Sequence, residues 1–379
     1  MWDFLTQLPH YALSFLFVLT IVVFFHELGH FLVARWTGVR VDVFSVGFGP
    51  ELFGFTDRKG TRWKLSMLPL GGYVKMFGEG EVTVNEQGEA RPLTLLERQV
   101  SFYHKPLWRR AAVVAAGPIA NYVLAILIFT GLFATYGQPF SSNLVGEVMP
   151  GSAAAEAGIM SGDRIIELNG KPITRFEQIV DTIAFGLGEP LHIVLERDGK
   201  QVIVDAQPQV VELVDNFGNV QRVGRLGIQS TGTGEVVHYG PIQSIGVAVA
   251  ETYRISATIL KSIGQMIAGT RSSGELGGVL RIAKLSGDIA TNGVVAIINF
   301  AALMSVNLGL LNLFPVPMLD GGHLAFYAAE AARGRRLSRQ AEEWGLRIGL
   351  AMVLTLFVFA TWNDLVSLRV IEFFRHLVG

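Results

Sequence analysis

Two histidines and a glutamate lie close together inside an apolar segment near the start of the chain. His26, Glu27 and His30 form the pattern HExxH within residues 11–34, which contain no other histidine or charged side chain. On a helix, residues i and i+4 share a face, so both imidazoles can bind one metal ion while the glutamate stands beside the attacking water. The pattern predicts a Zn²⁺ site with Glu27 as general base. The alternatives are a polar pair that joins two helices and a proton relay.

A zinc site of this kind needs a third protein ligand. Asp320 is the first acidic residue after the uncharged run 293–319, and it follows Pro315 and Pro317. These prolines break a helix and free backbone groups that need protein or water partners. A carboxylate beside such a break is typical of a site, so Asp320 is the predicted third ligand. It could instead cap a helix or begin a loop, and His323 is a second candidate ligand.

The elements that must position these residues are membrane spans. Half of the 379 residues are hydrophobic and only 17% are charged, with a mean hydropathy of +0.41, whereas soluble domains carry about 25% charged residues. A span needs roughly 20 apolar residues. Three segments, 11–34, 111–137 and 293–319, meet this length, and a fourth, 348–363, is marginal. A net charge of −1 argues against nucleic-acid binding, and the absence of cysteine excludes disulfides, thiolate ligands and a thiol nucleophile.

The distribution of basic residues predicts how the chain crosses the membrane. Residues 1–10 contain no lysine or arginine, so the first span does not read as a cleaved signal peptide. Basic residues are densest in 35–110 and 331–347, which are therefore expected in the cytoplasm. Residues 138–292 and both termini are expected on the other side.

The segment 141–237 reads as a small β-rich domain inserted between two spans. Its turn signals predict a short helix from Ser152, a longer helix over 176–185, and strands over 164–168, 191–197 and 202–206. The pattern is similar to that of PDZ domains, which bind a peptide as an added strand and hold its carboxylate in a glycine loop. Here that loop corresponds to Leu226, Gly227 and Ile228. The alternative is a stable β domain that binds no peptide. Within residues 241–290, the stretch 241–269 has apolar residues near helical spacing, which predicts an amphipathic helix either on the membrane surface or packed on the bundle.

Three motifs carry a family resemblance. HELGH (26–30), GPIAN (117–121) and NLFPVPMLDG (312–321) are similar to motifs of the site-2 protease family of intramembrane zinc metalloproteases. The resemblance implies that His26, His30 and Asp320 bind Zn²⁺ and that Glu27 is the base. It also implies that Asn312 helps to hold an unwound substrate segment. Substrate-binding positions in a membrane-dipping β-hairpin region would be Gly47, Phe48, Gly49, Gly71 and Tyr73. Asn121 either lines the bundle near the site or serves helix packing.

The predicted fold class is a polytopic α-helical membrane protein of about four transmembrane helices, with a membrane-associated β-hairpin region and an inserted β-rich PDZ domain. The predicted domains are 1–137 with two spans and the hairpin region, 138–237 as the PDZ domain, 238–292 as a membrane-surface segment, and 293–379 with the last two spans.

The family resemblance implies a multi-pass protein of a bacterial inner membrane. Expected partners are the lipid bilayer, single-span substrates of the anti-sigma-factor type or remnant signal peptides, and peptide C-termini at the PDZ groove. Two features depart from the best-known members: a single PDZ copy, and Gly277-Gly278 in place of a Gly-Pro turn ahead of the third span. A zinc or proton transporter and a PDZ scaffold with an inactive protease core are the rival functions.

Overall fold

The structure is a computed structural model, and it describes residues 2–78, 82–84, 90–214, 220–231 and 234–367. The chain divides into two compact units. The first comprises Met1–Phe129, Ala248–Ser256 and Gly277–Asp364, and the second comprises Thr130–Val247, Ala257–Leu276 and Leu365–Gly379. Each unit is described by itself.

Four helices of the described chain are long and apolar enough to cross a membrane. They are α1 (Trp2–Trp36), α3 (Leu107–Thr135), α8 (Val294–Asn312) and α10 (Arg339–Ser367). The expectation of about four spans is therefore met, but two boundaries differ. The third helix ends at Asn312, before the end of the uncharged run 293–319, because Pro315 and Pro317 break it as the sequence predicts.

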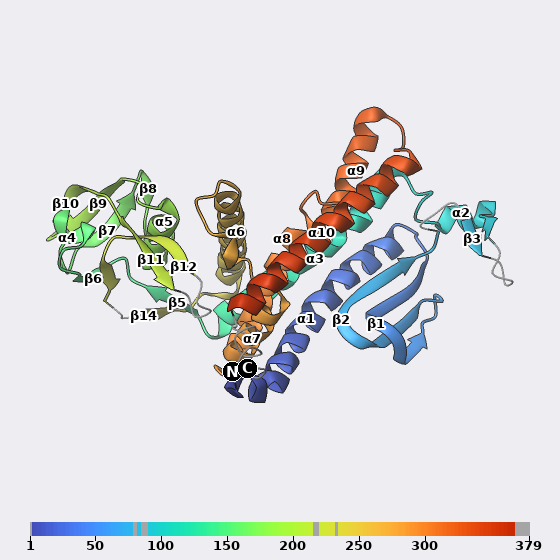
Figure 1. Cartoon of the computed structure of the whole chain (residues 1–379), viewed down its shortest axis with the longest axis horizontal. Helices are drawn as coiled ribbons and strands as arrows, with labels where there is room; N and C mark the ends of the chain where they lie inside the picture. The colour runs from blue at the N-terminus through green and yellow to red at the C-terminus, as the bar shows by residue number, and fades with distance from the viewer. Residues whose placement is uncertain (1, 79–81, 85–89, 215–219, 232–233, 368–379) are drawn as a thin grey trace, which may run out of the picture. The chain divides into compact units, whose positions relative to one another are not determined.

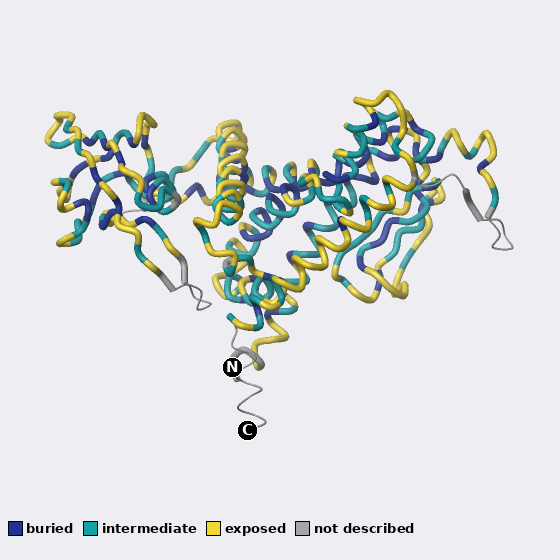
Figure 2. Tube along the Cα trace, turned by 45° about the horizontal axis from the view of Figure 1, so that its top comes forward, coloured by how far each residue is buried: buried dark blue, intermediate teal, exposed yellow. Residues whose placement is uncertain are grey.

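The fourth span is longer than the marginal apolar run 348–363 and includes Leu365. Its membrane-length helix covers Gln340–Ser367, because polar residues at both ends of the apolar run continue the same helix. Only 6% of its most apolar window is buried within the protein, and residues 350–359 are all in the exposed class, which is yellow in Figure 2. This helix therefore presents most of its surface to its surroundings, as expected of a span that faces lipid.

The spans α3 and α8 of the first unit both pack against α1 (Figure 1). Val18 and Val22 of α1 contact Phe300 and Ala301 of α8 in one buried cluster. The short helix α7 (Val279–Ala290) also packs along α1. The helix α9 (Asp320–Arg333) follows the break after α8.

The buried carboxylate of Asp364, near the end of α10, caps the start of α7. It accepts hydrogen bonds from the backbone N–H of Gly278 (2.8 Å) and of Arg281 (3.1 Å). A side chain at position 278 would overlap this carboxylate. Glycine here therefore admits the cap, which explains why Gly277-Gly278 can stand where a Gly-Pro turn was expected.

A β region lies against α1 in the same unit. The strands β1 (Val41–Thr56) and β2 (Arg62–Met76) bend back on each other. Residues 43–46 pair with 72–75 on one side and with 62–65 on the other, and residues 51–56 pair with 62–66. The rings of Phe44, Trp63 of β2 and Phe31 of α1 contact one another. An ion pair between Arg35 and Asp57 joins α1 to the β1–β2 turn. The strands β3 (Val82–Val84) and β4 (Ala90–Pro92) and helix α2 (Leu95–Val100) lead to α3.

The second unit contains a β-rich domain with one apolar core. The predicted strands over 164–168 and 191–197 are β7 (Arg164–Leu168) and β9 (Leu191–Arg197) with the same boundaries. The predicted helices are α4 (Ala153–Glu156), capped by Ser152, and α5 (Phe176–Gly186). The central sheet has the order β10-β9-β7-β8. Its other two strands are β8 (Lys171–Pro172) and β10 (Lys200–Ala206). Three separate pairs complete the domain: β5 (Gln138–Ser141) with β14 (Gly234–Val237), β6 (Val145–Val148) with β13 (Ile228–Ser230), and β11 (Gln209–Val214) with β12 (Val220–Arg225).

The helix α6 (Pro241–Ile267), which is followed by the short η1 turn (Ser273–Glu275), has an unusual distribution of burial. Thr252 and Ser256 are buried, and the Ser256 hydroxyl lies 3.1 Å from that of Tyr122 on α3. Its large apolar side chains are exposed instead, including Ile242, Tyr253 and Ile267. The middle of α6 thus contacts the bundle through small polar residues.

Candidate active site

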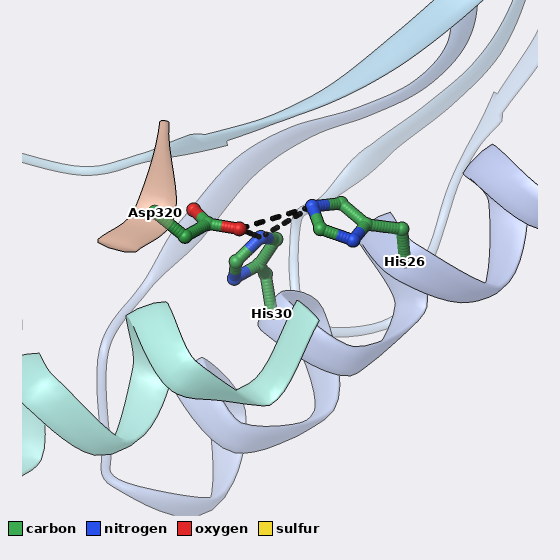
Figure 3. A group of neighbouring side chains, drawn as sticks. All are labelled: His26, His30 and Asp320. Carbon is green, nitrogen blue, oxygen red and sulfur yellow. Dashed lines mark hydrogen bonds and ion pairs between the residues drawn. The ribbon is translucent and has the colours of Figure 1, made fainter. Parts of the chain in front are cut away.

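The helix α1 presents both histidines of the HExxH motif on one face. His26 and His30 are buried, their rings are nearly perpendicular, and their Nε2 atoms are 3.3 Å apart. One helical turn separates the two residues, which is what brings both rings to the same place. Figure 3 shows the two imidazoles converging on the carboxylate of Asp320.

Asp320 is the first residue of α9, and its Oδ2 atom completes the group. This atom lies 3.1 Å from Nε2 of His26 and 3.5 Å from Nε2 of His30. The structure therefore brings together the three residues that the sequence analysis assigned to a metal. His323, the rival candidate, lies one turn further along α9 and does not belong to the group.

The three converging atoms fit a zinc ion better than a hydrogen-bonded cluster. Zinc bonds of about 2.0–2.1 Å in tetrahedral geometry put neighbouring ligand atoms about 3.3 Å apart. The three separations here are 3.1, 3.3 and 3.5 Å. The Oδ2 atom of Asp320 is buried and has no partner with hydrogen-bond geometry. A cation bound by this oxygen and by the two imidazole nitrogens would supply the partner that the oxygen lacks.

The second ring nitrogen of each imidazole, Nδ1, also has a partner. Nδ1 of His30 donates to the carbonyl of Val113 on α3 at 2.8 Å, which leaves Nε2 free to bind a metal. Nδ1 of His26 lies 3.1 Å from the amide nitrogen of Asn121, which is fully buried. Meanwhile the amide oxygen of Asn121 is buried without a partner. Turning the amide by 180° lets this oxygen accept from Nδ1–H of His26, and amide orientation is assigned by such networks.

Close approach of α3 to the histidines depends on glycine, which the sequence analysis did not identify. A Cβ atom at Gly117 would overlap Nε2 of His30, and one at Gly29 would overlap Ala116 and Ala120 of α3. Small residues let membrane helices pack backbone to backbone. The signal was present in HELGH and GPIAN, since each motif carries a glycine on the face that meets the other helix.

Glu27 lies beside the edge of the β region. A Cβ atom at Gly72 would come within 3.1 Å of Cγ of Glu27, and the backbone amide of Val74 interacts with the Glu27 carboxylate. Residues 72–76 of β2 pair with residues 41–46 of β1. The part of the sheet next to Glu27, the proposed general base, is therefore the strand segment 72–76.

The predicted substrate-binding residues of the hairpin lie together at its bend. Gly47, Gly49 and Gly71 have φ values of 88°, 89° and 141°, which favour glycine. The ring of Phe48 stacks on Tyr73 with centroids 5.9 Å apart, and a side chain at Gly71 would overlap Phe48.

The remaining predicted residues lie elsewhere in the chain. Asn312 is half-buried and is the last residue of α8. In the second unit, Leu226 is buried, Gly227 has a φ of 85°, and Ile228 pairs with Val148 of β6. The carbonyls of Leu226 and Gly227 accept from the backbone of Ala154 and Met149, so the loop is anchored from one side.

A buried ion pair holds the other end of α9. Arg110 of α3 donates to the Glu330 carboxylate at 2.6 Å, and both side chains are at most 6% exposed. The guanidinium of Arg110 also stacks over Tyr327 of α9. Because α9 begins with Asp320, this pair fixes the helix that carries the third candidate ligand.

Comparison with known proteins gives a consistent result. The chain matches the model of peptidase family M50 over residues 14–356. A relative from Agrobacterium fabrum is 46% identical over 365 residues, covering 95% of this chain and 97% of its own. One from Rhizobium meliloti is also 46% identical, covering 95% and 98%. Both names include the words zinc metalloprotease. Metalloprotease MmpA of Caulobacter vibrioides is 35% identical over 384 residues, covering 95% and 96%.

Among solved structures, the PDZ domain of the SdrC-like protein from Listeria monocytogenes aligns with 24% of this chain and 90% of its own. The identity is 20% and the TM-score is 0.19.

Proposed function

Since this chain belongs to peptidase family M50 and is a multi-pass zinc metalloprotease, we propose that it cleaves membrane proteins within their transmembrane segments. The observation that carries the proposal is the position of the site. His26, Glu27 and His30 lie within a membrane-length helix, and Asp320 meets them where another such helix has ended. A protease centre on that helix acts on peptide bonds that lie in the membrane.

In the proposed mechanism, His26, His30 and Asp320 hold the metal and Glu27 moves the proton. Zinc bound there supplies a Lewis acid that polarises the scissile carbonyl. Glu27 takes the proton of the attacking water and delivers it to the leaving amine, which suits a carboxylate positioned beside both. The amide of Val74 interacts with this carboxylate and orients it.

A helical substrate must first expose its peptide bonds. We expect the unwound segment to pair as a strand with the β region beside Glu27, because backbone pairing would satisfy the amides that unwinding frees. Residues 72–76 offer such an edge next to the base. Asn312, with its polar amide at the end of α8, would hold another part of the unwound segment.

The substrates we propose are single-span proteins of the anti-sigma-factor type and remnant signal peptides, cleaved in regulated intramembrane proteolysis. The inserted domain is proposed to be a PDZ domain whose loop at Leu226, Gly227 and Ile228 holds a peptide C-terminus or controls entry to the site. Its strand order and its glycine loop support this assignment.

We further propose that the protein lies in a bacterial inner membrane with the inserted domain and both termini in the periplasm. The chain has no cysteine, so single cysteines report topology without background. A cysteine replacing Asp198 in the inserted domain should react with an impermeant maleimide in cells with an opened outer membrane. One replacing Lys59 in the β1–β2 turn should not react. The reverse labelling would overturn this orientation.

The test of the proteolytic proposal is cleavage of a tagged single-span substrate in membranes. The wild-type chain should cleave it, and Glu27→Gln should abolish cleavage while leaving bound zinc at one per chain. Removal of zinc by a chelator should also stop cleavage, and added zinc should restore it. Undiminished cleavage by Glu27→Gln would show that the proposed mechanism is wrong.

A further inference from the structure

An open cavity of about 380 Å³ lies where α1 ends and α3 begins. It is lined by Trp36, Thr37, Gly38, Trp108 and Arg109. Trp36 is the last residue of the first span, and Trp108 is the second residue of the next one. The cavity therefore lies where the chain leaves the membrane after the first span and enters it again at the second. Tryptophans concentrate at the depth of lipid headgroups, and these two are 77% and 58% exposed.

The cavity is positively charged. Arg109 donates to the carbonyl of Thr37 at 3.3 Å, yet its Nε is buried without a partner. The buried amine of Lys105 lies just behind this lining, because a Cβ atom on Gly38 would come within 3.3 Å of it. The amine donates one hydrogen bond to the carbonyl of Gln99 at 2.6 Å, which leaves its other two N–H groups for a ligand. Burial and the charge of Arg109 both lower the pKa of Lys105. Two cations are therefore close together, and the lining itself contains no carboxylate.

Other arginines at this end of the bundle are arranged differently. Arg35 pairs with Asp57, Arg91 with Glu97, and Arg110 with Glu330. In the part of the chain that the structure describes, Lys105 and Arg109 form no ion pair with an acidic side chain. Cations that lack an internal counter-charge and face the headgroup region attract an external anion.

We propose that this cavity binds the phosphate of an anionic phospholipid in the leaflet adjacent to residues 37–106. The guanidinium of Arg109 and the amine of Lys105 would donate to the phosphate oxygens, while the two indoles flank the headgroup. Leu32 is 55% exposed and lies one helical turn before Trp36, where it offers an apolar surface to an acyl chain. The lipid would then join the end of the helix that carries HExxH to the start of the helix that carries Asn121.

The experiment measures binding of phosphatidylglycerol and phosphatidylcholine to the full chain in detergent by native mass spectrometry. We expect phosphatidylglycerol to bind more tightly. Its affinity should fall roughly tenfold in Arg109→Gln and in Lys105→Gln, as expected for loss of a charge-assisted hydrogen bond. Arg58→Gln is the matched control, because it removes one exposed positive charge from the β1–β2 turn.

Three outcomes would overturn the proposal. The first is an equal loss in Arg58→Gln, which would show that only net charge matters. The second is equal binding of the two lipids, which would show that the site does not select an anionic headgroup. The third is binding of inorganic phosphate with no binding of phosphatidylglycerol, which would identify a soluble anion as the occupant. Zinc content, measured in parallel, verifies that each variant is folded.

Discussion

Replacing Asn121 with leucine should weaken zinc binding without unfolding the protein. The amide of Asn121 is the partner of Nδ1 of His26, and it is fully buried. Without it, the imidazole loses the group that fixes its tautomer and its ring orientation. Loss of such a partner costs about 10–100-fold in metal affinity, which corresponds to roughly 1.4–2.7 kcal/mol. Leucine has the same number of side-chain heavy atoms and the same branch at Cγ, so the substitution leaves no cavity.

The assay is competition for zinc between the purified chain and a fluorescent chelator. Asn121→Asp should bind zinc nearly as well as the wild type, because a carboxylate also accepts from Nδ1–H. Ser305→Ala is the matched control. Ser305 is fully buried, and its hydroxyl donates to the backbone carbonyl of Asn121 at 2.8 Å. This hydrogen bond involves the backbone of Asn121 and not the side-chain amide that lies next to His26. Wild-type zinc affinity in a folded Asn121→Leu protein would refute the reasoning.

Three further predictions concern the supports of the site. Gly117→Ala should lower zinc content severalfold, measured by metal analysis, because its methyl would overlap His30; full occupancy would contradict the packing argument. Glu330→Ala should lower the free energy of unfolding by about 3–5 kcal/mol, measured by thermal denaturation, because it leaves Arg110 buried and unpaired. Replacing both residues by apolar ones should lower it less. Burial opposes ionisation of Asp57, but hydrogen bonds from Trp63, Thr61 and Arg35 lower its pKa from 3.8 to about 2. Its stabilisation is therefore present above pH 3.8 and is lost as the pH falls towards 2. Fluorescence of Trp63 should follow that loss in the wild type but not in Asp57→Asn.

Local patterns in the sequence predicted much of the structure. HExxH needs only the helical repeat to bring two imidazoles together, and the strands over 164–168 and 191–197 are bounded by turn residues such as Asn169 and Asp198, whose φ values are both 50°. Asp320 was found by its chemistry, as a lone carboxylate beside a broken helix. In each case the signal lies within about ten residues of the feature that it predicts.

Features that depend on distant residues were not predictable in this way. The pair between Arg110 and Glu330 spans 220 positions, and a single sequence does not indicate which buried charges meet. Asn121 could be placed near the site or in helix packing, and only its distance to His26 relates it to the site. The apolar run 348–363 left the length of the fourth span open, because hydropathy does not record that the flanking polar residues continue the helix.

The break after α8 explains how a third candidate ligand reaches histidines on another helix. If α8 had continued, its rise of 1.5 Å per residue would carry Asp320 about 12 Å beyond Asn312. Instead Pro315 and Pro317 end the helix, and Met318 adopts a φ of 87°, a conformation that L-residues rarely take. The chain then turns back so sharply that a side chain at Gly321 would overlap the carbonyls of Leu313 and Phe314. The carboxylate of Asp320 thus reaches His26 and His30 only because the prolines end α8 and the glycines let the chain turn back. Either feature alone would leave Asp320 displaced along the axis of the bundle.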